Sequence, residues 1–133
     1  MPLLIGASLA IAVGLFATVT GLDRDRAFYP TVTIVVAALY SLFAVMGGTP
    51  AALRVELMAG AVFLAAAVFG FRTSLWITAV ALAGHGLFDF VHGRIISNAG
   101  VPEWWPAFCG AYDVVAGAYL GVLLRTGRIR STS

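Results

Sequence analysis

Five apolar runs, each about as long as a bilayer is thick, take up most of the sequence. They cover residues 3–22, 31–48, 50–71, 75–94 and 103–124. A hydrocarbon core of ~30 Å needs about 20 apolar residues in a helix, and a helix satisfies its own backbone polar groups in lipid. Charged residues make up only 11% of the chain, against roughly 25% in soluble domains. We therefore predict an all-α integral membrane bundle of five transmembrane helices, with residues 1–133 forming a single domain.

The basic residues are divided unevenly between the two ends of this predicted bundle. All eight of them are arginine. One end would carry Arg24, Arg26, Arg72, Arg125, Arg128 and Arg130, and the other Arg54 and Arg94. Cytoplasmic loops carry the excess of positive charge, so we predict an external N-terminus and a cytoplasmic C-terminus. This arrangement describes a multi-pass protein of a cell inner or plasma membrane, and the Ala/Val/Gly/Arg-rich composition favours a bacterial source.

Small residues recur at the spacing that lets transmembrane helices approach closely. Gly6, Ala10 and Gly14 lie four residues apart in the first run, and Gly117 and Gly121 do so in the fifth. Such faces pack against another helix, in the same chain or in a second copy. The expected partners are membrane lipids and a second copy in a homodimer. No basic run is long enough to indicate nucleic-acid binding.

Ionisable residues gather in the half of the bundle that faces outward in the predicted orientation. His85, Asp89 and His92 fall within about 60° of arc on one helical face. Asp113, with Cys109 one turn before it, lies at a similar depth in the fifth run, as does Glu56 in the third. At ~1.5 Å rise per residue, that depth is roughly 10 Å. Ionisable groups inside a membrane are costly and by default indicate function.

The spacing on this stripe suits a metal ion. His85, Asp89 and His92 would supply two imidazoles and a carboxylate, which fits Zn²⁺ or non-haem iron. We predict a divalent metal site at His85, Asp89, His92 and Asp113, with Glu56 as a further base or ligand. Without a metal, His85 and Asp113 would act as acid and base. A purely structural His85–Asp89 hydrogen bond also fits the pattern.

Aromatic residues flank these polar groups in sequence. Trp104 and Trp105 are typical of an aromatic belt at the membrane interface. Alternatively, they belong to the wall of a substrate pocket beside the carboxylates, where aromatic faces suit a cationic ligand or intermediate. The residues predicted for this pocket are Phe88, Trp104, Trp105, Phe108, Cys109 and Tyr112.

The stretch His85-Gly86-Leu87-Phe88-Asp89-Phe90-Val91-His92, followed by Trp105, Phe108-Cys109 and Asp113, resembles a pattern of small multi-spanning bacterial membrane proteins of unassigned function. That resemblance implies a multi-helix membrane protein and no particular activity. His85-x-x-x-Asp89 with Asp113 is also similar to the sterol isomerase and sigma-2 receptor superfamily. This second similarity implies proton transfer on a lipid within a helical bundle, although Asp89 stands where that superfamily has glutamate.

Three function classes follow from the sequence. The first is a membrane enzyme acting on a lipid or isoprenoid, metal-dependent or acid–base, with His85, Asp89, Asp113 and Glu56 as catalytic residues. The second is a protein that binds or transports a metal ion, a proton or a small cation. The third is a structural accessory subunit whose polar residues hold the bundle together.

Overall fold

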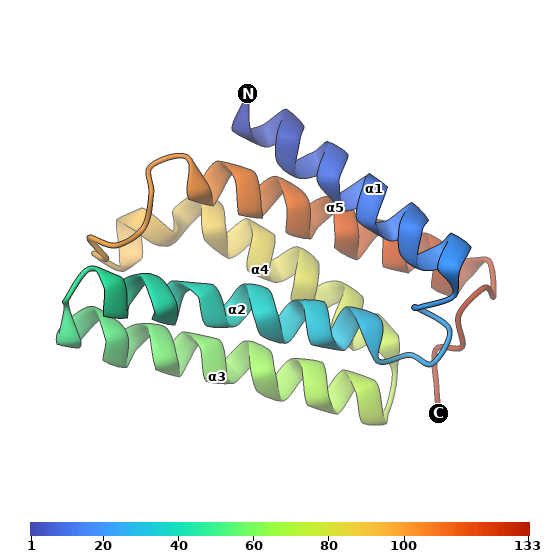
Figure 1. Ribbon diagram of the computed structural model, residues 1–133. Helices are drawn as coiled ribbons and strands as arrows, with labels where there is room; N and C mark the ends of the chain where they lie inside the picture. Colours follow the sequence, from blue (N-terminus) through green and yellow to red (C-terminus); the bar gives the residue numbers. More distant parts are fainter.

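Five helices make up the computed structural model (Figure 1), which describes the whole chain from Met1 to Ser133. They are α1 Pro2–Thr20, α2 Phe28–Met46, α3 Pro50–Arg72, α4 Leu75–Ile95 and α5 Trp105–Arg125. All five are long and apolar enough to cross a membrane. The predicted all-α membrane-spanning bundle is confirmed.

Helix starts show the largest differences from the predicted boundaries. α2 begins at Phe28 rather than at residue 31, because Pro30 falls in the first turn, where a helix needs no N–H from it. The turn before α2 is held by Ala27, whose N–H donates to Asp25 Oδ1 over 3.0 Å. α5 begins at Trp105 rather than at residue 103, because the chain first makes a turn in which Trp105 N–H donates to the Pro102 carbonyl.

Helix α4 lies at the centre of the bundle. It packs against α5, α3 and α2, whereas α1 packs mainly on α5 and α2 mainly on α3. Figure 1 shows α1 beside α5 on one side of α4, and α2 beside α3 on the other. α1 and α2 are therefore neighbours along the chain without extensive packing between them, which leaves room between α2 and the α1–α5 pair.

The small-residue faces predicted from the sequence are used inside the chain. Gly6 of α1 lies against the backbone of Phe108, and Gly14 lies against the ring of Tyr119. On the other side of α5, Gly117 faces the backbone of α4 at Ala79. These contacts bring α1 and α4 onto opposite sides of α5 at close range. A homodimer would therefore have to use other surfaces.

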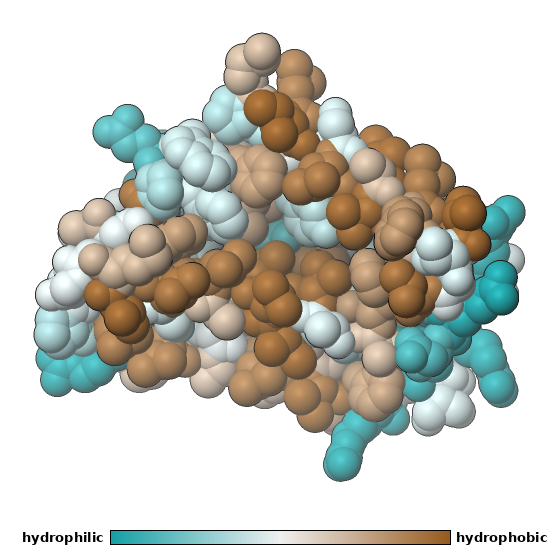
Figure 2. All heavy atoms as spheres, viewed as in Figure 1, coloured by the Kyte–Doolittle hydropathy of each residue, from teal (hydrophilic) through white to brown (hydrophobic).

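The two ends of the bundle differ in charge. An apolar surface covers the middle of the molecule, and hydrophilic residues gather at both ends (Figure 2). The α1–α2 connection, the α3–α4 turn and the C-terminal tail share one end (Figure 1). That end, called here the arginine-rich end, carries Arg24, Arg26, Arg72, Arg125, Arg128 and Arg130. The opposite, arginine-poor end is formed by the α2–α3 turn and the α4–α5 loop.

Candidate metal centre

The polar centre of the molecule depends on a close crossing of α4 and α5. A Cβ added to Gly86 would lie 2.6 Å from the carbonyl oxygen of Gly110, and one added to Gly110 would lie 2.9 Å from that of Gly86. Only glycine allows the two backbones to come this close. The neighbouring side chains, His85 on α4 and Cys109 on α5, are thereby directed into one small space.

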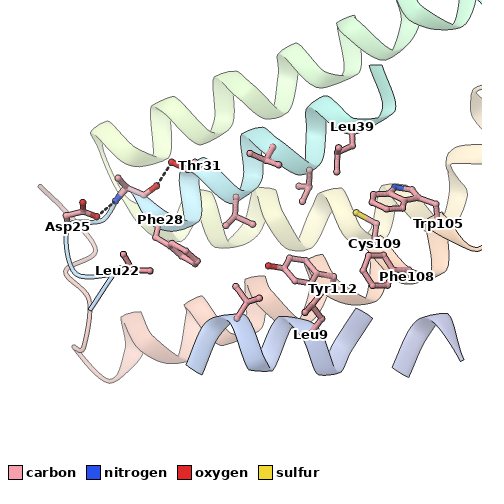
Figure 3. A pocket seen from close by; sticks show the side chains of 15 residues that line it. Leu9, Leu22, Asp25, Phe28, Thr31, Leu39, Trp105, Phe108, Cys109 and Tyr112 are labelled. Carbon is pink, nitrogen blue, oxygen red and sulfur yellow. Dashed lines mark hydrogen bonds between the residues drawn. The ribbon is translucent and has the colours of Figure 1, made fainter. Parts of the chain in front are cut away.

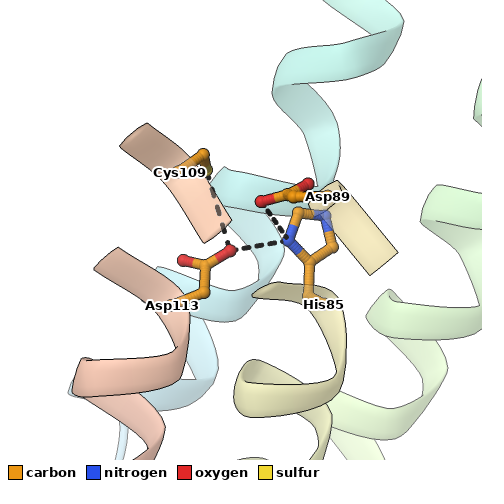
Figure 4. Close-up of side chains that lie close together, drawn as sticks. All are labelled: His85, Asp89, Cys109 and Asp113. Carbon is orange, nitrogen blue, oxygen red and sulfur yellow. Dashed lines mark hydrogen bonds and ion pairs between the residues drawn. The ribbon is translucent and has the colours of Figure 1, made fainter. Parts of the chain in front are cut away.

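Four side chains meet at this crossing (Figure 4): His85 and Asp89 of α4, and Cys109 and Asp113 of α5. His85 Nδ1 lies 2.7 Å from Asp113 Oδ2, in a hydrogen bond, and 3.7 Å from Asp89 Oδ2. The Cys109 thiol donates to Asp113 Oδ2 over 3.7 Å. Each of the four residues is no more than 2% exposed. The group is called here the α4–α5 cluster.

The α4–α5 cluster has a ligand set and dimensions that could hold a metal ion. One ligand atom from each residue lies within 4.8 Å of all the others. Tetrahedral Zn²⁺, at bond lengths of about 2.0–2.3 Å, separates its ligands by roughly 3.4–3.8 Å. The cluster therefore needs a contraction of about 1 Å at its widest. Imidazole, carboxylate and thiolate together favour Zn²⁺ or Fe²⁺ over harder cations.

Several buried oxygens in this region have no hydrogen-bond partner. They are both carboxylate oxygens of Asp89, Asp113 Oδ1 and the hydroxyl of Tyr40. Burying an unpaired polar group costs free energy, and burying an unpaired charge costs much more. A cation bound between the two aspartates, or protons on them, would remove this cost. The unpaired oxygens therefore require either a bound cation or protonated carboxylates in this region.

His92 and Glu56 form a separate polar group nearer the arginine-poor end. His92 Nε2 lies 2.8 Å from Glu56 Oε1, and the Asn98 amide donates to the same oxygen over 2.8 Å. Asn98 also donates to the carbonyl of Tyr40 over 3.1 Å, and the Tyr40 ring stacks on His92 at 4.0 Å. This second group joins α2, α3, α4 and the α4–α5 loop.

The structure therefore places the predicted ligands in two groups. His85, Asp89 and Asp113 come together as expected, but His92 and Glu56 do not join them. His85 and His92 are seven residues apart, which is about 10.5 Å along the helix axis, too far for ligands of one ion. The fourth residue of the group is Cys109, which the sequence placed in the pocket wall and also offered, with Asp113 and Glu56, as a residue that could complete the ligand set. Its spacing of one turn from Asp113, equal to that of His85 from Asp89 on the facing helix, was the available signal.

An apolar groove of about 480 Å³ runs between α1, α2 and α5, and Figure 3 shows its lining side chains. Of the residues predicted for a pocket, Trp105, Phe108, Cys109 and Tyr112 line this groove. The opposite walls come from Leu9, Val13, Leu22, Asp25, Ala27, Phe28, Thr31, Val32, Val35, Val36 and Leu39. Sequence reasoning missed these walls because they are ordinary apolar positions of transmembrane helices.

The other two residues predicted for the pocket lie elsewhere. Trp104 is exposed at the surface, with its ring against those of Trp105 and Phe108. Phe88 lies on the α3 side of α4, where its ring contacts His85 and His92. Cys109 thus belongs both to the groove and to the α4–α5 cluster, and it connects a space lined by apolar residues with the buried polar centre.

No protein-family model, curated protein sequence or solved structure gives a significant match to the chain. Both resemblances drawn from the sequence remain predictions.

Proposed function

We propose that this protein is a membrane-embedded metalloenzyme that acts on a lipid or isoprenoid. In this proposal His85, Asp89, Cys109 and Asp113 hold a divalent metal ion, zinc or iron. The observation that carries the proposal is the meeting of four potential ligand atoms within 4.8 Å, all buried inside a membrane-spanning bundle. The unpaired oxygens of Asp89 and Asp113 support it, because a cation would supply the missing partners.

The proposed substrate class is supported by the location of the cluster. Its four residues lie in the transmembrane part of α4 and α5 and are almost inaccessible to water. A water-soluble substrate would have to lose its hydration to reach them, whereas a membrane lipid would not. Four protein ligands complete a tetrahedral set. A bound metal ion would therefore supply Lewis-acid activation of a polar group on the substrate only if that group replaced one of the four residues. Cys109 is the cluster residue that a molecule in the groove would meet first.

The short distance between His85 and Asp113 favours a version of the same function that uses acid–base catalysis without a metal. His85 Nδ1 and Asp113 Oδ2 are 2.7 Å apart, within the range in which two groups share or exchange a proton. In this version His85 and Asp113 move a proton on the lipid without a metal. It is the version that the proposed similarity to the sterol isomerase superfamily would favour.

Transport of a cation, the second class considered from the sequence, has less support. Below the α4–α5 cluster, toward the arginine-rich end, the buried core is mainly apolar, with Ala79, Leu82, Ala116 and Leu120. A translocated ion needs polar groups or water along its path. A structural role would account for the His85–Asp113 hydrogen bond and the His85–Asp89 ion pair, but it would leave the Asp89 oxygens without a hydrogen bond.

Elemental analysis of the purified protein tests the metal. We expect a near-stoichiometric transition metal in the wild type and its loss in His85→Ala and Asp113→Asn. His92→Ala is the matched control, because it removes a buried histidine of the same helix from outside the cluster. Absence of metal from a folded wild type reconstituted with zinc or iron would rule out the metal-dependent version.

A comparison of lipid profiles tests the proposed enzymatic activity. Membranes of a host that expresses the wild type would be compared by mass spectrometry with membranes that contain Asp113→Asn at equal abundance. We expect one lipid or isoprenoid species to be depleted and a product to accumulate only with the wild type. Unchanged lipid profiles, together with a stoichiometric metal, would indicate a metal-binding protein without lipid chemistry.

A further inference from the structure

We infer that the groove between α1, α2 and α5 binds a single hydrocarbon chain, acyl or isoprenoid, with an oxygen-bearing end at Trp105 and Cys109. The rest of the chain extends along α2 toward the arginine-rich end. Reaction of that oxygenated end at the α4–α5 cluster rests on the proposed function. Binding of the chain rests only on the shape and chemistry of the groove.

The dimensions of the groove fit one extended chain. The lining residues of α2 run from Phe28 to Leu39, a distance of about 16 Å at 1.5 Å per residue. Over that length the groove has a volume of about 480 Å³. The volume itself lies within the range of ~300–1,000 Å³ that is usual for small-molecule sites.

The same dimensions are too small to enclose a whole helix. A helix with its side chains is about 10–12 Å across, so its section is about 80 Å² or more. A helix of a second copy, or of a single-pass partner, could therefore place only the side chains of one face in the groove. The groove lies between membrane-spanning helices, where the surrounding solvent is lipid. A lipid chain is thus both the available and the fitting occupant.

The polar atoms along the groove indicate how the chain is oriented. At the end near the arginine-rich side, Asp25 and Thr31 are already satisfied by local bonds to the backbone of Ala27 (Figure 3). At the other end, the indole Nε1 of Trp105 is buried without a partner. A hydroxyl, carbonyl or carboxyl oxygen arriving there would accept this hydrogen bond, which is costly to leave unmade. Cys109, one helical turn after Trp105, lines the same groove.

Fluorescence quenching of Trp105 tests this inference. In a Trp76→Phe/Trp104→Phe background Trp105 is the only tryptophan, and dibromostearic acid is the quenching probe in detergent solution. We expect quenching that saturates at one chain per protein. Val35→Phe, which fills the groove from α2, is expected to weaken binding by about tenfold or more. Val80→Phe, the same change at an exposed site on α4 outside the groove, is expected to have no effect.

Competition tests the orientation. Stearyl alcohol is expected to displace the brominated probe at much lower concentration than octadecane, because only the alcohol can accept from Trp105 Nε1. Equal competition by the two would overturn the placement of the oxygen. Quenching that rises without saturation, and equally in Val35→Phe, would overturn the chain site altogether. Native mass spectrometry of the unaltered protein with stearyl alcohol gives the number of bound chains per protein without tryptophan substitutions.

Metal binding by the α4–α5 cluster and binding of a hydrocarbon chain in the groove can be tested separately. The quenching titration is repeated on chelator-treated protein and on His85→Ala, where chain binding is expected to persist. Saturable chain binding in a protein that takes up no metal would remove the metal from the proposed function and leave the groove. A stoichiometric metal in a protein without saturable chain binding would overturn the chain site and leave the metal site in place.

Discussion

His85 and His92 lie on one stripe of α4, yet each pairs with a carboxylate from a different helix. His85 contacts Asp113 of α5, and His92 contacts Glu56 of α3. The first pair leaves carboxylate oxygens unsatisfied beside it, whereas Glu56 Oε1 receives partners from both His92 and Asn98. We therefore assign chemistry to the His85 group and a structural role to the His92 group.

Substitution of Glu56 tests this division. Glu56→Ala leaves His92 and Asn98 without a buried partner, so we expect a loss of roughly 1–3 kcal/mol in the free energy of unfolding. Glu56→Gln retains an oxygen for both donors and is expected to lose less. Thermal unfolding in detergent measures both, and elemental analysis is expected to find the metal unchanged. Loss of metal in a folded Glu56→Gln protein would contradict the structural role.

Cys109 is the ligand that most strongly determines the metal's identity. Cys109→Ser replaces a soft sulfur with a hard oxygen, which favours Mn²⁺ or Mg²⁺ relative to Zn²⁺. Because even outer-shell changes cost about 10–100-fold in metal affinity, we expect zinc affinity to fall by at least about tenfold. Competition with a fluorescent zinc chelator measures this. Unchanged zinc affinity would mean that Cys109 is only a groove residue.

The sequence predicted single residues correctly where only their angular position around a helix mattered. It predicted them poorly where the distance between two side chains mattered. The shared face of His85, Asp89 and His92 followed from their spacing. Their spacing did not show whether they belong to one site, and they do not, because two turns of helix separate His85 from His92. Asp113 was correctly grouped with His85 and Asp89 from its depth in the membrane, whereas the choice of Cys109 over Glu56 and His92 required the crossing of α4 and α5. Asn98 lies between the fourth and fifth predicted helices, and nothing in the sequence indicated its hydrogen bond to Glu56.

At the scale of helices, the α4–α5 crossing decides whether the site exists. Gly86 and Gly110 face one another where the two backbones are closest. This crossing places one turn of α4 opposite one turn of α5, so that two pairs spaced i, i+4 form a single four-sided group. The separation of the two backbones therefore sets the width of the cluster.

Paired glycine substitutions on α4 test the role of the crossing. In Gly86→Ala the new Cβ would lie 2.6 Å from Gly110 O, so we expect a loss of about 1–3 kcal/mol from overpacking. Metal content should fall with it, because His85 and Asp113 move apart. Gly84→Ala is the control, since a Cβ there meets nothing within 4 Å and alanine favours a helix by up to about 1 kcal/mol. Equal behaviour of the two variants in thermal unfolding and metal analysis would contradict this role.

Helix existence and length followed from hydropathy, because the thickness of a bilayer fixes the length of an apolar run. The neighbours of each helix did not follow. Lipid tails are as apolar as leucine, so an apolar face does not reveal whether it meets lipid or another helix. Gly6, Ala10 and Gly14 gave a correct packing face, but the sequence left open whether α5 or a second copy covered it. The groove beside α2 had no sequence signal at all.

At the scale of the whole molecule, the site lies off-centre along the same direction in which the arginines are unevenly distributed. The α4–α5 cluster and the oxygen-binding end of the groove lie toward the arginine-poor end. The hydrocarbon part of a bound chain extends toward the arginine-rich end. Orientation in the membrane therefore decides from which leaflet the substrate presents its oxygenated end.

Cysteine labelling of intact cells tests that orientation. Six of the eight arginines lie at one end, and such an excess remains in the cytoplasm. In a Cys109→Ser background, Ala99→Cys at the arginine-poor end should react with a membrane-impermeant maleimide in intact cells. Ser133→Cys, near the arginine-rich end, should react only after lysis. The opposite pattern would place the site in the cytoplasmic leaflet, and the substrate would then have to come from lipids facing the cytoplasm. Labelling of both positions in intact cells would indicate dual topology, which an arginine bias of this size opposes.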